Sequence, residues 1–392
     1  MAVNKFDNSM LDAGTIGTTA NKLLQLDGST KIPAVDGSLL TNIPSSFTKS
    51  ASDPTISTNP SGGVGSLWAN TTSGEVYCCT DATAGSNVWI NVGAGSGDVE
   101  PWTFQGTSYG YNAGGQRPSL YDIIDKFALA SDVNATDVGN LTVARQRASG
   151  HSSTASSYAS GGGNGSLSNV IDKWSNTSDG NATDVGDMTS AREYSSNSSS
   201  STYGYIAGGS TTTGSAFVNV IEKFSVASDG NSTDAADLLT AVGDLCGGQN
   251  SETYGYVAGG SVPPAYTLHN VIQKYSFASD ANSTDVGNQT VERERASGQS
   301  STTHGYTSGG TAGTYKDHID KFAFASDGDA VNVGDLTGTR NTTSGQSSTT
   351  YGYVCGGYPM SDIEKFAFAS DGNAVDAADL TVQRRNAAGT QI

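Results

Sequence analysis

The chain repeats one sequence pattern six times. A glycine doublet ends an aromatic segment at Gly114-Gly115, and five further doublets follow at steps of 47, 47, 51, 50 and 47 residues. After each doublet comes a motif of the type Ile-Asp-Lys-Phe, and its six copies begin at Ile124, Ile171, Ile221, Ile272, Ile319 and Ile363. A period of this length indicates supersecondary units that bury their apolar faces against one another.

Each copy has the pattern of four short strands. In the last copy, residues 351–357 form an aromatic segment that ends in glycine, and residues 363–369 alternate large apolar with polar or small residues. The pair Asp371-Gly372 predicts a hairpin turn into a fourth strand at 375–381. Four antiparallel strands per repeat are typical of a propeller blade, so the sequence predicts an all-β fold with a six-bladed β-propeller over residues 103–392. The repeats begin with a second strand and end with a first strand, so the two ends are expected to share one blade.

The composition favours strands and excludes some partners. Glycine accounts for 50 of 392 residues and charged residues for only 15% of the chain. The net charge is −18, with 20 basic against 38 acidic residues, which would repel a phosphate backbone, so we expect no nucleic-acid partner. The sequence has no signal-peptide pattern and no apolar run near the roughly 18 residues of a membrane span, so we expect neither secretion by a signal peptide nor membrane insertion.

The repeats resemble those of kelch propellers. The shared features are a hydrophobic strand, a glycine doublet, a strand with an aromatic end, and an arginine after the fourth strand. The resemblance covers residues 103–392. It departs in the fourth strand, where kelch repeats carry tryptophan and this chain has Val, Ala or Leu beside Asp. The resemblance implies a kelch-like propeller and leaves the function open, because propellers serve binding, scaffolding and catalysis.

The first hundred residues lie outside the repeats. Residues 18–43 contain short apolar clusters separated by Asp-Gly turns, and they are similar to segments of bacteriophage tail fibres and related virion appendages. Residues 53–92 contain Trp68, Tyr77 and Trp89 on three short runs, which resembles a small module of phage virion proteins. We therefore expect a virion-attachment and oligomerisation segment at 1–47, which the resemblance implies to be trimeric, and a small β module with a Gly-rich linker at 48–97.

Two sets of residues recur in the repeats and are expected to be structural. The second glycines of the doublets and the arginines after the fourth strands are Gly115, Gly162, Gly209, Gly260, Gly310, Gly357, Arg145, Arg192, Arg293, Arg340 and Arg384, with Gly243 interrupting the arginine series. Aspartates also recur in the fourth strands, at Asp137, Asp184, Asp234, Asp285 and Asp376. We expect the arginines to pair with these aspartates between blades. An alternative use of the aspartates in cation binding or acid–base chemistry is disfavoured, because catalytic sites break repeat symmetry.

Cofactor and metal sites are not indicated. The four histidines and four cysteines lack the spacing of metal ligands, and no glycine-rich loop has the helix and lysine of a phosphate site. We therefore expect no cofactor, no metal and no enzymatic activity.

The loops between the second and third strands vary from 6 to 12 residues and are the least repetitive part of each copy. Loops on a rigid scaffold that carry aromatic and polar side chains are suited to recognition of a sugar or a protein. The receptor-binding candidates are Arg117, Tyr121, Phe217, Tyr266, His269, Tyr315, Lys316 and Tyr358.

Together these features predict a bacteriophage virion protein, a tail fibre or appendage that is assembled in the host cytoplasm. Its N-terminus is expected to join tail, neck or baseplate proteins as a homotrimer, and its propeller loops to attach to a host surface glycan or outer-membrane protein. The alternatives are a purely structural decoration or neck appendage and, less favoured, a polysaccharide-degrading tailspike.

Overall fold

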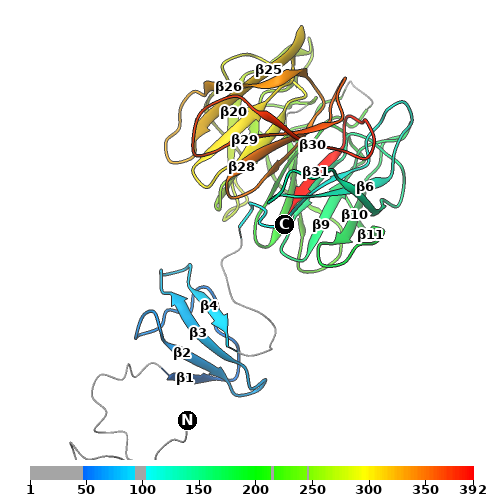
Figure 1. Cartoon of the computed structure of the whole chain (residues 1–392). Coiled ribbons are helices and arrows are strands. Elements are labelled where there is room, and N and C mark those ends of the chain that lie inside the picture. The colour runs from blue at the N-terminus through cyan, green and yellow to red at the C-terminus, as the bar shows by residue number, and fades with distance from the viewer. Residues whose placement is uncertain (1–46, 93–102, 213–215, 245–246) are drawn as a thin grey trace, which may run out of the picture. The chain divides into compact units, whose positions relative to one another are not determined.

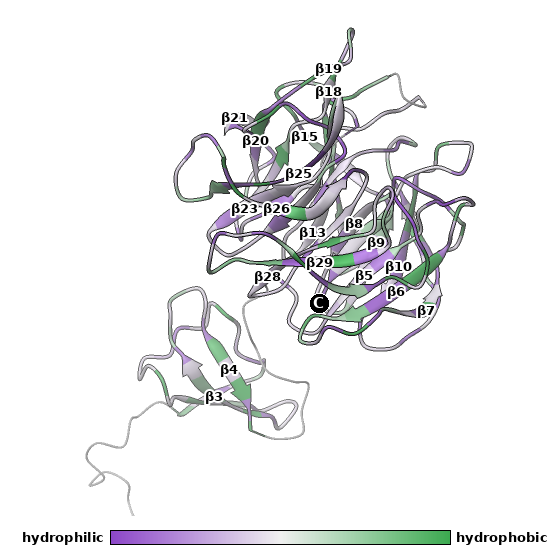
Figure 2. Ribbon diagram, turned by 45° about the horizontal axis from the view of Figure 1, so that its top comes forward, coloured by the Kyte–Doolittle hydropathy of each residue, from purple (hydrophilic) through white to green (hydrophobic). Residues whose placement is uncertain are grey.

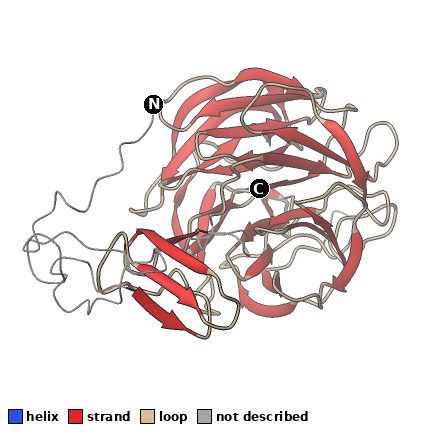
Figure 3. Ribbon diagram, turned by 60° about the horizontal axis from the view of Figure 1, so that its bottom comes forward, coloured by secondary structure: helices blue, strands red, loops and turns tan. Residues whose placement is uncertain are grey.

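The computed structural model describes residues 47–92, 103–212, 216–244 and 247–392. These residues form strands, turns and loops without a helix, so the expected all-β class is confirmed (Figure 3). Among them there is accordingly no helix that meets the length and hydropathy of a membrane span. The chain divides into two compact units, which comprise Met1–Pro101 and Trp102–Ile392 (Figure 1). The segment expected to attach and oligomerise, 1–47, lies outside the described residues except for Phe47.

The first unit contains one four-stranded sheet. Its strands are β1 (Phe47–Ser50), β2 (Leu67–Asn70), β3 (Val76–Asp81) and β4 (Val88–Asn91). β1 pairs with β2 in parallel, whereas the pairs β2–β3 and β3–β4 are antiparallel. Tyr77 and Trp89 are buried, and the ring of Trp68 meets that of Trp89 at 6.0 Å, so aromatic side chains form the small core.

The second unit contains six antiparallel sheets built on one plan, numbered here along the chain. Sheet 1 consists of β31 (Ala388–Gln391), β5 (Tyr109–Ala113), β6 (Ile123–Ala128) and β7 (Thr136–Asn140). Sheet 2 consists of β8 (Ser149–Ser152), β9 (Ser156–Ser160), β10 (Val170–Ser175) and β11 (Thr183–Asp187). Sheet 3 consists of β12 (Ser196–Ser199), β13 (Tyr203–Ala207), β14 (Val220–Ser225) and β15 (Thr233–Asp237).

The other three sheets follow the same order, with short extra strands in two loops. Sheet 4 consists of β16 (Gln249–Asn250), β17 (Tyr254–Ala258), β20 (Val271–Ser276) and β21 (Thr284–Asn288), beside the ribbon of β18 (Ser261–Val262) and β19 (Thr267–Leu268). Sheet 5 consists of β22 (Ser297–Ser300), β23 (His304–Ser308), β25 (Thr314–Ala323) and β26 (Val331–Arg340), with β24 (Thr311–Ala312) at its edge. Sheet 6 consists of β27 (Ser344–Ser347), β28 (Tyr351–Cys355), β29 (Asp362–Ala367) and β30 (Val375–Asp379).

The two ends of the repeat region meet in sheet 1. β31, the last strand, pairs with β5, the first strand of the region, with Ala388 opposite Ala113. Figure 1 shows β31, coloured red, among strands coloured cyan and green. The first strands of the sheets also contact one another in the order β8, β12, β16, β22, β27 and β31, and β31 contacts β8.

Each third strand serves two neighbouring sheets. In β6, Asp125 and Phe127 face sheet 6, where they meet Arg384 and the ring of Tyr353, while Ile124 and Lys126 face sheet 2. This explains the alternating motif, because a strand exposes successive side chains to opposite faces and both faces are covered. Figure 2 shows hydrophobic and hydrophilic residues on the same strands, as in β6 and β29.

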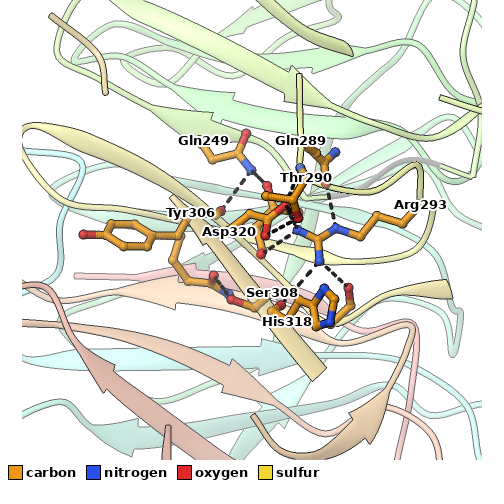
Figure 4. Close-up of polar contacts among 11 residues, drawn as sticks. Gln249, Gln289, Thr290, Arg293, Tyr306, Ser308, His318 and Asp320 are labelled. Carbon is orange, nitrogen blue, oxygen red and sulfur yellow. Dashed lines mark hydrogen bonds and ion pairs between the residues drawn. The ribbon is translucent and has the colours of Figure 1, made fainter. Parts of the chain in front are cut away.

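Buried ion pairs join the sheets. An arginine that follows the fourth strand of one sheet pairs with a carboxylate on the third strand of the next: Arg145 with Asp172, Arg192 with Glu222, Arg293 with Asp320, Arg340 with Glu364 and Arg384 with Asp125. All ten side chains are 2% exposed or less. Figure 4 shows Arg293 between Asp320 and Gln289, with Thr290 donating to the same carboxylate.

The expected partners of these arginines were therefore wrong. The aspartates of the fourth strands, such as Asp137 and Asp184, are exposed and accept hydrogen bonds from the backbone of the residue two positions later. The arginine pairs instead with the carboxylate of the Ile-Asp-Lys-Phe motif, because that carboxylate points into the space between two sheets.

Among the described residues, the seam between sheets 3 and 4 has no such ion pair. Val242, rather than Gly243, occupies the arginine position of this seam. The carbonyl oxygen of Val242 accepts a hydrogen bond from the amide of Gly209, as the carbonyl oxygen of Arg145 does from the amide of Gly115. The carboxylate position of the next sheet is Gln273, whose Oε1 accepts from the amide of Leu239 and the hydroxyl of Ser283. The arginine and the carboxylate are thus replaced together, which leaves no buried charge without a partner.

Two further contacts recur at all six seams. A lysine of each third strand pairs with an exposed aspartate of the next sheet, as in Lys126–Asp179 at 2.8 Å, and Lys365 with Asp132 joins sheets 6 and 1. An Asn or Asp side chain also accepts a backbone amide of the preceding sheet, as Asn134 does from Asp379. The members of the second series are Asn134, Asn181, Asn231, Asn282, Asp329 and Asn373.

The glycine doublets have conformations that other residues rarely adopt. Gly115 has φ +100°, and a Cβ there would lie 2.9 Å from the carbonyl oxygen of Arg385. The second glycines share this positive φ: Gly115, Gly162, Gly209, Gly260, Gly310 and Gly357. A side chain would be strained and would push the sheets apart at this point.

We predict that Arg293→Val lowers the free energy of unfolding by about 3–5 kcal/mol, because it leaves the carboxylate of Asp320 buried without its partner. The double variant Arg293→Val with Asp320→Gln reproduces the natural pair Val242 and Gln273 and should recover at least half of that loss. Urea unfolding measures both. As a control, Lys274→Gln removes a pair whose aspartate is 58% exposed and should cost less than about 1 kcal/mol. A double variant no more stable than the single variant would contradict the argument.

His151 predicts a pH dependence of stability. It is fully buried on β8 with its ring against Phe224 at 5.1 Å, and burial lowers its pKa to about 4. The unfolded chain binds the proton near pH 6.5 and the folded chain does not. The contribution of His151 to the free energy of unfolding is therefore fully present above pH 6.5, and about 3 kcal/mol of it is lost as the pH falls toward 4. His151→Gln places here the residue found at Gln299 and Gln346, and it should remove this part of the pH dependence of the urea midpoint. An unchanged slope in the variant would show that His151 is not the cause.

Candidate functional site

The variable loops lie at one end of the six sheets, together with the connections that join one sheet to the next. Each connection pairs with a variable loop by a β-bridge: Gln116 with Arg385, Gln146 with Gly163, Glu193 with Ser210, Gly243 with Ser261, Glu294 with Thr311 and Asn341 with Tyr358. We call the surface formed by these loops and connections the loop face. The bridges fix each loop against the sheet before it.

Four side chains gather where the loops of sheets 1, 5 and 6 meet. The guanidinium carbon of Arg117 lies 4.8 Å from the ring centre of Tyr358, and that of Arg385 lies 5.8 Å from it. The ring of Tyr315 meets that of Tyr358 edge to face at 6.0 Å. Tyr315 and Tyr358 are 40% and 38% exposed and Arg117 and Arg385 are half-buried, so the group presents two rings and two partly exposed cations to solvent.

The other candidates are dispersed over the loop face. Phe217 is half-buried, and its ring contacts Tyr266 at 5.3 Å and covers Gly243, where a Cβ would lie 2.2 Å from the Phe217 ring. Tyr266 is 46% exposed. Tyr121 is half-buried and donates its hydroxyl to the carbonyl of Arg117. The structure therefore separates a Phe217–Tyr266 pair from the group around Tyr358.

The two remaining candidates are polar. His269 is half-buried, and burial lowers its pKa. The Nζ of Lys316 lies 3.4 Å from the hydroxyl of Thr314.

A central cavity of about 110 Å³ is lined by the first strands of all six sheets, mainly by serine, glycine and asparagine. Arg147, Tyr194 and Arg295 line it near the start of these strands, and Phe104 lines it as well. Both arginines stack on Tyr194, at 4.6 and 5.4 Å, and both are paired, Arg147 with Glu193 and Arg295 with Asp244.

The sequence reasoning missed the residues that line this cavity. The sequence carried a signal, because one position of the repeat is occupied by five different residue types. Its residues in the six copies are Arg147, Tyr194, Asp244, Arg295, Thr342 and Asn386. All six have positive φ, which brings them to the ends of the first strands.

Asp317, His318 and Asp335 form a group that could hold a metal ion. One ligand atom of each lies within 4.8 Å of the others, because His318 of β25 stands opposite Asp335 of β26. The sequence did not predict this group, since the two segments meet only through strand register. The equivalents of His318 in sheets 1 to 4 are Ile123, Val170, Val220 and Val271.

No protein-family model matches the chain, and no curated protein matches its sequence. The site is therefore interpreted from its own geometry.

The position of His318 allows a direct test of its role. Its Nδ1 is buried without a hydrogen-bond partner, and such a group costs about 1–3 kcal/mol. We expect His318→Ile, which introduces the residue found at Ile123, to raise the free energy of unfolding by about 1 kcal/mol. The measurement is urea unfolding with a chelator present, so that no bound cation contributes. A less stable variant would show that the imidazole has a stabilising partner in solution.

Proposed function

We propose that residues 103–392 form a six-bladed, kelch-like β-propeller and that the protein is a bacteriophage tail fibre or appendage that attaches the virion to a host cell through the loop face. Support for the propeller comes from six sheets with one strand order, first strands that contact one another in sequence, and a last strand that completes sheet 1. The proposal of a virion protein rests on the resemblance, noted from the sequence alone, of residues 18–43 and 53–92 to segments of phage virion proteins.

The observation that carries the attachment function is the pair of neighbouring tyrosines, Tyr315 and Tyr358. Large aromatic side chains bury apolar area and fix orientation when a ligand covers them. Tyr315 lies at the start of β25 and pairs with Thr311 of β24, and Tyr358 pairs with Asn341 of the connection from the sheet before it, so the backbone of both residues is held before a ligand arrives. In this proposal the N-terminal segment joins other virion proteins and makes a homotrimer, and the receptor is a surface glycan or an outer-membrane protein.

We predict that the double variant Tyr315→Ala with Tyr358→Ala loses at least about tenfold in affinity for host cells, the loss expected when central aromatic contacts are removed. The experiment measures saturable binding of fluorescent full-length protein to bacteria that support growth of the virus. The matched control is Tyr254→Ala, which removes a tyrosine of similar exposure, 39%, at the other end of sheet 4. If the unaltered protein fails to bind such cells, the attachment function is wrong and a structural decoration takes its place.

A further inference from the structure

The arginines of this chain divide into two groups. Seven of the nine pair with a carboxylate within 4.0 Å: Arg145, Arg147, Arg192, Arg293, Arg295, Arg340 and Arg384. Arg117 and Arg385 take part in none of the ion pairs among the described residues. In a protein with 38 acidic side chains and a net charge of −18, two neighbouring arginines without a carboxylate are an exception that needs a cause.

Both exceptions lie at one place on the loop face. The backbones of Gln116 and Arg385 exchange two hydrogen bonds, of 3.0 and 3.2 Å, and these hold the segments of the two arginines side by side. Both guanidinium groups stack on the ring of Tyr358. Both arginine side chains are half-buried, and an anion placed against their exposed part would supply acceptors to the two guanidinium groups.

We call Arg117, Tyr315, Tyr358 and Arg385 the basic aromatic patch. Lys316 does not belong to it, because it follows Tyr315 in β25, where successive side chains point to opposite faces, and its ammonium contacts the Thr314 hydroxyl at 3.4 Å. Two rings and two arginines that take part in none of the ion pairs of the described residues, on a strongly acidic protein, indicate complementarity to a negatively charged ligand.

We infer that the ligand of the loop face is an acidic polysaccharide, whose carboxylate groups bind Arg117 and Arg385 and whose sugar ring lies against Tyr315. This inference rests on the proposed attachment function and narrows it to one class of receptor. A guanidinium binds a carboxylate through two parallel hydrogen bonds, and contact with the ring of Tyr358, at 4.8 and 5.8 Å, holds both guanidinium groups at one place. An acidic peptide would satisfy the arginines but has no need of an exposed ring beside them.

The test uses the full-length protein and two forms of one polymer, polygalacturonate and its methyl ester, immobilised on a sensor surface. The two share a sugar backbone and differ in charge. We expect at least about tenfold tighter binding to the acid form, with a loss on raising the salt concentration, because exposed charges are screened within about 10 Å at 0.1 M. Arg117→Gln and Arg385→Gln should each weaken binding to the acid form about tenfold, and Arg117→Lys should restore part of the affinity, since it keeps the charge without the paired donors.

The controls separate charge, folding and function. Lys49→Gln removes one exposed positive charge from the other unit and should leave binding unchanged. Thermal unfolding of each variant shows whether a loss of binding reflects misfolding. If the double variant Arg117→Gln with Arg385→Gln does not fold, the two single variants are compared in its place.

Three results would overturn the inference. The first is equal affinity for the acid and its methyl ester. The second is equally tight binding of polyaspartate, which would indicate an acidic peptide as the ligand. The third is host-cell binding that survives in the double variant Arg117→Gln with Arg385→Gln but is lost in the double variant Tyr315→Ala with Tyr358→Ala. That result would support the attachment function and exclude an acidic receptor. Failure of the unaltered protein to bind host cells refutes the attachment function itself.

Discussion

The buried arginine–carboxylate pairs between sheets are the constraint on which the rest of the second unit depends. A charge removed from water is unfavourable unless a partner and hydrogen bonds compensate for it, so Arg293 and Asp320 must meet at one geometry and at no other. The carboxylate also accepts the amide and hydroxyl of Thr290, which ties the connection between sheets 4 and 5 to the third strand of sheet 5. Such pairs contribute less to net stability than to the choice of one packing, because well-packed apolar residues would serve stability as well. Apolar side chains between the sheets supply the burial at every seam, and at five of the six seams an ion pair adds a contact that depends on one register of the two sheets.

This register determines what the loop face presents. The arginine of each pair lies in the connection between two sheets, and the same connection pairs with the next variable loop. Arg384 is buried against Asp125, while its neighbour Arg385 emerges beside Gln116 and stacks on Tyr358. A buried interaction thus places the partly exposed side chain of Arg385 one residue away. The loops can vary in length and sequence because their ends are fixed by contacts in which the loop side chains take no part.

Individual residues show where sequence reasoning succeeds and where it does not. The alternation of Ile124, Asp125, Lys126 and Phe127 predicted a strand, and the strand is present as part of β6. The same alternation did not reveal that both faces are covered, so the partner of the arginines was assigned to the exposed Asp137 and not to Asp125. Sequence spacing placed the missing arginine at Gly243, which lies three residues after Thr240 as Arg145 lies three residues after Thr142. The structure shows instead that Leu239 takes the place of Thr142, since its amide donates to the side chain of Gln273 as that of Thr142 does to Asp172, and that Val242 takes the place of Arg145.

The sequence by itself determined the repeat, the strand content, the turns and the set of loops that vary, because these depend on the local preferences of glycine, aspartate and alternating apolar residues. Tertiary structure alone decided which side chains meet across seams and loops. Arg117 and Tyr358 are more than two hundred residues apart, and no spacing within either loop indicates that they stack. His318 and Asp335 meet only through the register of β25 and β26, and the paired replacement of Val242 and Gln273 becomes visible only when the two sheets are packed together. Contacts of this kind depend on where the backbone places each residue in space, and a one-dimensional pattern carries that information only within a single strand or turn.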